Sequence, residues 1–322
     1  MIQSVVYRDS KFVADCPPPE SLAALRQDPA VMLWVDLAEP TEAEIRQIMQ
    51  DLFALHPLTI EDCLQDSPLP KYEEYESYVY IVAHAVDYTR TEKFTTTELD
   101  LILGKNFLLT FHRRPIKGVQ TCRERILRSP GTLIRGPDRF AHTLLDLIVE
   151  NFKPALDAIR NEIEAVEDAV LARSKEPLAQ RIVDLREDLT TLRQILRPQR
   201  ELAVALAGGR TGFFRPKLLP YMRDLSDDLV RIEEQVKSWS EQLIFTFKLF
   251  LNRSTHETNE GVRVLTGLTA VAIPLMIIGS WFSMNFRHSP LLASRSAYWV
   301  VVTITVTSTI ALFIYMKRRK WL

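Results

Sequence analysis

The sequence predicts a mixed α/β domain, then long helices, and finally two membrane-spanning helices at the C-terminus. Strand-like segments rich in β-branched and aromatic residues are confined to the first 140 residues. Apolar residues then recur every three or four positions, which is typical of amphipathic helices. After residue 263, charged residues almost disappear until a basic end, although the net charge of the 322 residues is only −1.

The predicted α/β domain covers residues 1–140. Strands are expected at 31–37 and 78–88, and residues 99–112 are expected to form a hairpin that turns at 104–106. Thr41 precedes two acidic residues and is expected to cap a helix that runs to Leu52. The N-terminus lacks a basic region followed by an apolar core, so we expect no signal peptide and a cytosolic location for this domain.

Two apolar repeats after residue 140 predict an antiparallel helical pair at 141–212. One repeat runs from Leu145 to Val170 and the other from Leu178 to Leu196, with Pro177 at the expected first helical position. A third repeat begins near Leu218. We expect that helix to continue from there into the first apolar segment, as a stalk (213–263) that leads to the membrane, with a total length on the order of 100 Å.

Two uncharged segments are long enough to cross a bilayer. They are 264–286, with 23 residues, and 297–316, with 20 residues, and a helix needs about 20 residues to span the hydrocarbon core. The basic tail at 317–322 favours the cytoplasmic side. We therefore expect both termini in the cytosol and the loop at 287–296 outside.

The first predicted span carries hydroxyl side chains, among them Thr266, Thr269 and Ser280. Polar groups in lipid face either a partner helix or water, so both a pore and helix packing explain them. A simple membrane anchor is a further alternative, but an anchor rarely needs two spans. One hairpin cannot enclose a pore, so conduction would require an oligomer.

Other functional classes have little support in the sequence. The balanced charge gives no indication of a nucleic-acid partner. The three cysteines, Cys16, Cys63 and Cys122, fit neither a disulfide framework nor a CxxC metal site. There is no P-loop, GxSxG or HExxH motif, so an enzyme is not predicted.

Several motifs occur in a distinctive order between about Trp34 and Leu322. They are the segments 56–82 and 99–112, then TNEGVRVLT at 258–266, a proline-containing span, SMNF at 283–286 and KRRKWL at 317–322. Together they resemble the CorA family of divalent-cation channels, including its ZntB-like branch. The resemblance implies a homopentameric funnel in the inner (plasma) membrane, with an N-terminal αβα domain, a stalk helix that lines the pore and an outer second helix.

The implied cargo is a divalent cation, with Mg²⁺ first and Co²⁺, Ni²⁺ or Zn²⁺ as further candidates. In the family a Gly-Met-Asn triplet ends the first span, and a ring of its asparagines meets the hydrated ion. Met284 and Asn285 match this triplet, whereas Ser283 replaces the glycine. Neutral amide oxygens can hold Mg²⁺ through its waters without trapping it. A helix C-terminal cap is the alternative role for Asn285.

The resemblance also implies a set of pore-lining residues. Asn259 matches the family's pore asparagine on the cytoplasmic side, and apolar rings at Leu265 and Ile273 would close the path by dewetting. Lipid contact or helix packing is the alternative for each position. The full set, spaced by three and four residues, is Asn259, Val262, Leu265, Thr269, Ile273 and Met276.

The external loop departs from the family pattern because it contains Arg287, His288 and Arg295 and no acidic residue. Family members that import magnesium commonly carry acids there. A ring of basic groups would repel cations by several kT at low salt, so the ion and the direction of flux stay open. The histidines lack metal-ligand spacing, which leaves His288 a weak zinc ligand.

The family places a regulatory metal between subunits. Asp224 matches the acid on the stalk, and Asp87 lies near the second position. A metal bound there would favour the closed packing, whereas a solvated acidic face is the alternative reading. The rival function is a non-conducting relative that senses ions or binds a partner: Met284 and Asn285 favour the channel, and the basic loop favours the rival.

Overall fold

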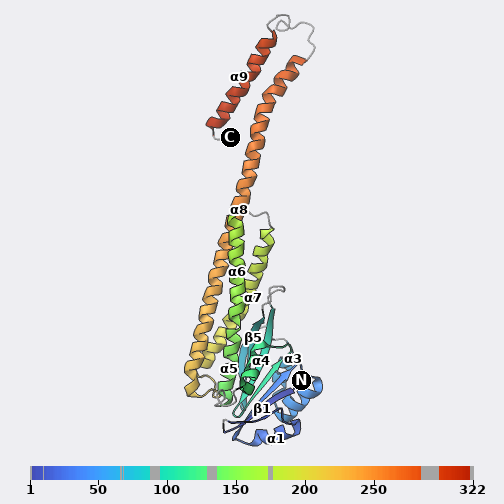
Figure 1. Cartoon of the computed structure of the whole chain (residues 1–322), viewed down its shortest axis with the longest axis vertical. Helices are drawn as coiled ribbons and strands as arrows, with labels where there is room; N and C mark the ends of the chain where they lie inside the picture. The colour runs from blue at the N-terminus through green and yellow to red at the C-terminus, as the bar shows by residue number, and fades with distance from the viewer. Residues whose placement is uncertain are drawn as a thin grey trace. The chain divides into compact units, whose positions relative to one another are not determined.

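The N-terminal unit, Met1–Phe245, is built around a β-sheet (Figure 1). The sheet has seven strands in the order β2-β1-β3-β7-β6-β5-β4. The structure of the chain is a computed structural model that describes residues 2–9, 11–65, 67, 69–87, 95–128, 136–172, 177–283 and 297–319. β3 and β7 are parallel, and the other neighbouring strands are antiparallel. The strands are β1 (Ile2–Arg8), β2 (Lys11–Asp15), β3 (Val31–Ala38), β4 (Lys71–Glu74), β5 (Tyr78–Asp87), β6 (Thr95–Gly104) and β7 (Phe107–His112).

The strands and the hairpin predicted from the sequence are present. β3 and β5 occupy the predicted segments, and β6 and β7 are joined at Gly104–Asn106. Gly104 is required at this turn because a Cβ atom there would collide with the ring of Phe107. β1, β2 and β4 were not predicted. Edge strands such as β2 and β4 are short and half-exposed, so their apolar pattern is weak.

One face of the sheet is covered by α1 (Pro19–Gln27), α2 (Glu42–Ile45), a π-helix η1 (Arg46–Leu52) and α3 (Pro57–Leu64). Their apolar side chains form a buried core with those of β3, β5, β6 and β7. This core includes Leu22 of α1, Met49 of η1, Phe53 directly after η1 and Cys63 of α3, each at most 1% exposed. Burial of this apolar surface is the main force that holds the helices on the sheet.

The predicted helix at Thr41 begins as expected and then changes form. The Thr41 side chain accepts a bond from the Glu44 amide, and the Glu44 side chain accepts one from Thr41, which makes a capping box. The next seven residues form η1, in which the Phe53 amide bonds back five residues to the Ile48 carbonyl at 3.0 Å. The turn ends at Ala54, which has a positive φ of 48°. The sequence pattern predicted an α-helix here and could not reveal the wider turn.

The opposite face of the sheet is covered by α4 (Lys117–Arg128) and α5 (Pro137–Glu150). Trp34 packs edge-on against Phe140 of α5, with ring centroids 4.7 Å apart, and its Nε1 donates to Thr110 Oγ1 at 3.0 Å. Thr110 donates in turn to Asp36 at 2.5 Å, and His112 Nε2 lies 3.4 Å from the same carboxylate oxygen. The sheet is thus the middle layer of an αβα sandwich, as the resemblance implied.

Two further helices, α6 (Phe152–Leu171) and α7 (Leu178–Ala207), lie side by side and bury one apolar seam each (Figure 1). The short connection between them makes them antiparallel, as predicted. The first apolar repeat, however, is divided between α5 and α6 by a turn at Asn151. Pro177 lies at the N-cap, one residue before the helix, so the predicted start is off by one position. α5 also runs through residues 140 and 141, between which the sequence suggested a domain boundary.

After a short 3₁₀ turn, η2 (Pro216–Leu218), the chain enters α8 (Leu219–Ser283), which continues through Pro274. Its residues up to Phe245 belong to the N-terminal unit. The C-terminal unit, Thr246–Leu322, comprises the rest of α8 and α9 (Ala297–Arg318). Both helices are long and apolar enough to cross a membrane, and 6% of each apolar window is buried within the chain.

The buried pair of Asp36 and His112 predicts a pH-dependent stability. Burial alone would lower the pKa of His112, but the hydrogen bond to Asp36 and its charge outweigh burial and raise that pKa above its ordinary value. The folded protein therefore binds the proton more tightly than the unfolded chain. This stabilisation is complete below about pH 6.5 and is lost as the pH rises through the raised pKa.

Asp36→Asn should lower the free energy of unfolding by about 1–3 kcal/mol at pH 6, because it removes the charged partner of His112. It should also flatten the fall in stability between pH 6 and pH 9. Thermal denaturation of the purified full-length protein across this range measures both effects. His256→Gln, on an exposed stretch of α8, serves as the control, and an Asp36→Asn profile parallel to wild type would contradict the pairing.

Candidate functional site

The six predicted pore positions lie on one face of α8. With 100° of rotation per residue, the side chains from Asn259 to Met276 fall within an arc of about 120°. All six are exposed in the single chain, including Val262 at 56%, Leu265 at 64% and Met276 at 65%. Residues on other faces of the same segment, such as Val264 and Leu268, are exposed as well, so the predicted face is distinguished by its composition of one amide, one hydroxyl and four apolar side chains.

The hydroxyl groups of this segment bond to their own helix. Thr269 Oγ1 donates to the Leu265 carbonyl at 2.8 Å, and Thr266 Oγ1 donates to the Val262 carbonyl at 2.7 Å. A threonine that is satisfied in this way does not need a polar partner in the membrane. The threonines are therefore weaker evidence for a pore than the sequence suggested. The stronger evidence is the face defined by Asn259 and the apolar positions.

The predicted selectivity triplet sits at the end of α8. Ser283 is the last residue of the helix. Its side chain, together with Met284 and Asn285, lies outside the described residues, as do Arg287, His288 and Arg295 of the loop.

The proposed regulatory acid Asp224 is exposed on α8 and lies near acids of α5. Burial, with added repulsion from Glu150, Asp228 and Asp224, raises the pKa of Asp146. His142 stands beside them; its ring nitrogen is 3.2 Å from the Tyr221 carbonyl, and burial lowers its pKa. Sequence reasoning missed Asp146, because its place opposite Asp224 arises only when α5 and α8 pack together.

The second predicted regulatory acid, Asp87, ends β5, where its backbone pairs with Thr95 of β6. Its side chain is outside the described part of the chain. Within the described residues, no group of three or more His, Cys, Asp or Glu side chains is arranged to hold a metal ion. A cation at Asp224 would therefore need ligands from water or from another copy of the chain.

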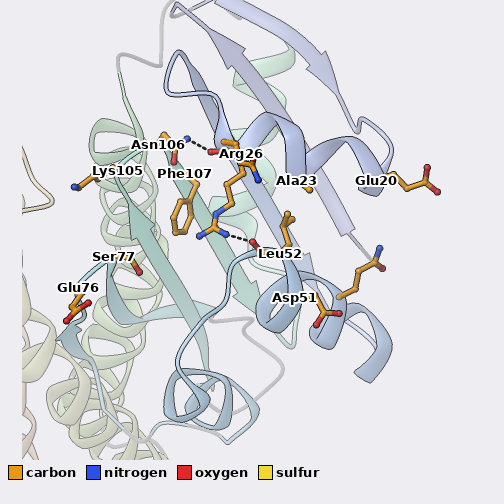
Figure 2. Close-up of a pocket in the computed structure, with 12 residues that line it drawn as sticks. Glu20, Ala23, Arg26, Asp51, Leu52, Glu76, Ser77, Lys105, Asn106 and Phe107 are labelled. Atoms are coloured by element: carbon orange, nitrogen blue, oxygen red, sulfur yellow. Dashed lines mark hydrogen bonds between the residues drawn. The ribbon is translucent and has the colours of Figure 1, made fainter.

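The N-terminal unit also has a groove of about 720 Å³ beside the β6–β7 turn (Figure 2). Arg26 crosses it: the guanidinium lies 5.0 Å from the ring centre of Phe53 and 5.3 Å from that of Phe107. It donates to the carbonyls of Leu52 and Phe53, at the end of η1, while Asn106 donates to the Arg26 carbonyl at 2.8 Å. These bonds satisfy carbonyl groups that a helix end leaves open. Arg26 thus holds the groove together structurally.

Comparison with known proteins identifies the family. A family profile described as CorA-like Mg²⁺ transporter protein matches residues 29–318. The chain belongs to the CorA family. It is a divalent-cation transporter and not an enzyme, with a cytosolic N-terminal domain and two C-terminal transmembrane helices.

Individual members and structures agree with this assignment. The chain is 28% identical over 305 residues to the cobalt/magnesium transport protein CorA of Thermotoga maritima, covering 94% of this chain and 87% of that protein. The complete structure of the CorA magnesium transporter from Methanocaldococcus jannaschii matches with a TM-score of 0.84 at 20% identity, over 99% of this chain and 98% of that one. The full-length CmaX protein matches with a TM-score of 0.83 at 17% identity, over 99% and 97%.

Arg26→Lys should lower the free energy of unfolding by about 1–3 kcal/mol, because an ammonium group cannot bond to both carbonyls and stack on two rings at once. Thermal denaturation of the full-length protein measures the loss. Arg46→Lys, at an exposed position of η1, is the matched control. Equal stability of the two variants would show that Arg26 does not hold the end of η1.

Proposed function

We propose that five copies of the chain surround a central path for divalent cations, with Mg²⁺ as the principal ion, Co²⁺ next, and Ni²⁺ or Zn²⁺ as further candidates. The exposed face of α8 that begins at Asn259 carries this proposal. Like the other faces of this segment, it is exposed in the described single chain; self-association around an axis would cover it and leave the other faces to lipid. The Thermotoga relative is a cobalt/magnesium transport protein, which supports the choice of ions.

Asn285 is proposed to form the selective ring at the outer end of the path, beside Ser283 and Met284. Mg²⁺ gives up its water reluctantly, so a ring of neutral amides can recognise the hydrated ion without binding it too tightly to release. Ser283 adds a Cβ and a hydroxyl where the family has glycine, and it narrows this entrance or adds a ligand there. Arg287, His288 and Arg295 lower the local cation concentration, so conduction should rise with ionic strength.

Two apolar positions, Leu265 and Ile273, are proposed to form the closed gate. A ring of such side chains around a narrow path excludes water, and an ion cannot cross a dry constriction because it would lose its hydration. The helix supplies these side chains at an interval of eight residues, so the two rings lie about 12 Å apart along its axis. Val262, Thr269 and Met276 complete the wall.

The proposed channel predicts that Asn285→Ala abolishes divalent-cation flux. Purified protein in proteoliposomes, loaded with an ion-sensitive dye, should take up Mg²⁺, and Co²⁺ and Zn²⁺ should rank below it. Asn161→Ala, at an exposed position on α6, is the matched control and should conduct as wild type does. Absence of flux for every ion from a folded oligomer would overturn the channel and favour the sensing function.

A second proposal concerns regulation by the transported ion. The mutual repulsion of Asp224, Asp146 and Asp228 is relieved when a divalent cation binds, so the cation should stabilise the packing of α5 against α8. Asp87 remains the proposed partner acid from another copy of the chain.

Asp224→Asn should reduce the Mg²⁺-induced rise in the thermal denaturation midpoint by at least half, because it removes a cation ligand and part of the repulsion. The full-length protein is measured with and without Mg²⁺ at constant ionic strength. Asp157→Asn, at an exposed position on α6, controls for the loss of one negative charge. If both variants keep the wild-type response, Asp224 is part of a solvated surface only.

A further inference from the structure

Beyond the end of α3, the sheet presents polar side chains to a cavity of about 500 Å³. The residues involved come from β5 and β6, where His84 pairs with Glu98 and Val82 pairs with Asp100. Glu98 and Asp100 are two positions apart on β6, so their side chains emerge on the same face of the sheet. This place is separate from the predicted ion path and from the acids around Asp224.

Two carboxyl groups meet here in a buried setting. Asp100 is only 2% exposed, and its carboxyl group is hydrogen-bonded to that of Glu98. The second oxygen of Glu98 accepts a bond from the Ser67 amide at 2.7 Å. Two ionised carboxylates in such contact would repel each other, and neither could donate the hydrogen bond. A proton shared between the two groups would remove the repulsion and supply the donor.

A chain of hydrogen bonds connects this pair to helix α3. The Tyr80 hydroxyl donates to Asp100 Oδ1 at 2.7 Å, and Cys63 Sγ on α3 lies 3.9 Å from the Tyr80 oxygen. Burial raises the pKa of both Tyr80 and Cys63, so the hydroxyl and the thiol stay protonated and can only follow changes at Asp100. Three elements, β6, β5 and α3, thus share one buried polar cluster.

The charged and titratable groups around the pair come from every neighbouring element. Burial, followed by the charge of Glu98, raises the pKa of Asp100 well above its ordinary value, and the charge of Arg113 only partly offsets this. Arg113 donates to the Cys63 carbonyl at 3.1 Å. Among the described residues, this set comprises Asp62 and Cys63 of α3, Lys71 of β4, Tyr80 and His84 of β5, and Arg113 and Arg114 after β7.

We propose that Glu98 and Asp100 form a proton-binding site of the cytosolic domain, which holds one proton between two carboxyl groups at neutral pH and releases it to the adjoining cavity as the pH rises. Release leaves two negative charges in contact beneath the end of α3. The pair then loses its internal hydrogen bond, and the repulsion weakens the packing that links β6, β5 and α3. The proposal is independent of the ion path: it concerns how this domain responds to pH.

The expected effect on stability has a definite sign. The folded protein holds a proton that the unfolded chain releases at the ordinary pKa of an aspartate, about 3.9. Stability therefore falls as the pH rises from that value through the raised pKa of the folded state. Asp100→Asn supplies a permanent neutral donor in place of the protonated acid, so it removes this dependence.

Infrared spectroscopy of the full-length protein at pH 7 is the first test. The wild type should show a band from a protonated carboxyl group that disappears in Asp100→Asn and is retained in Asp51→Asn, a variant at an exposed acid of η1. The thermal midpoint of wild type should also fall relative to that of Asp100→Asn as the pH rises from 5 to 9.

Absence of the protonated-carboxyl band in wild type would overturn the proposal. A constant difference in midpoint between wild type and Asp100→Asn at every pH would overturn it too. Should Asp100→Asn not fold, Glu98→Gln makes the same test from the other partner: its amide can donate to an ionised Asp100, so the band should vanish and the pH slope should flatten. A band that persists in a folded Glu98→Gln would contradict a shared proton.

Discussion

The structure of the C-terminal unit depends on apolar side chains that the chain itself cannot cover. Trp281, Tyr298 and Trp299 are 66%, 70% and 68% exposed, and 6% of each apolar window is buried within the chain. In water such a surface would drive aggregation. A bilayer covers such a surface, and in the proposed channel further copies of the helices would enclose the face that begins at Asn259. Membrane insertion and the proposed self-association would both answer this constraint.

The same constraint limits the chemistry available to the ion path. A charged side chain in the middle of a span is costly, and the described residues of the two spans carry charges only near their ends, such as Arg263 and Lys317. Threonine hydroxyls are satisfied by the helix's own carbonyls. In the proposed channel, recognition of a divalent cation would therefore fall to neutral amides at the ends of the path. Such groups would meet the ion in its hydrated form, which suits an ion that keeps its water.

The sequence could predict those features of the fold that depend on residues close together in the chain. The apolar spans, the helix cap at Thr41 and the turn at Gly104 depend on residues close together in the chain, and the structure confirms them. The π-turn at η1 and the break at Asn151 depend on packing against the sheet, so no local sequence pattern predicted them. The edge strands β2 and β4 were not predicted for a related reason: they are short and partly exposed, so their apolar pattern is weak.

The candidate site divides in the same way. Asn259 and the positions that follow were predicted from the resemblance and from helical spacing, which places them on one face of α8. The acids beside Asp224 were not, because Asp146 belongs to a helix some 80 residues earlier in the chain. Asp100 was hidden for a further reason: in the sequence it reads as the polar member of an alternating strand, which predicts exposure to water. Its burial arises from the cover given by α3.

Each buried acid in the cytosolic domain needs a compensating positive charge. The acids differ in which group supplies that charge. Asp138, 2% exposed, is held by Arg215, whose Nε donates to it at 2.7 Å, and an arginine keeps its charge at every physiological pH. Asp36 relies on His112, which releases its proton as the pH rises. Asp100 lies beside another acid, and the charge of Arg113 offsets the effect on its pKa only in part; the proposed shared proton supplies the rest. The three acids therefore differ in how strongly their contacts depend on pH. Of the three, the contact between Asp138 and Arg215 is the one that does not change with the pH of the cytosol.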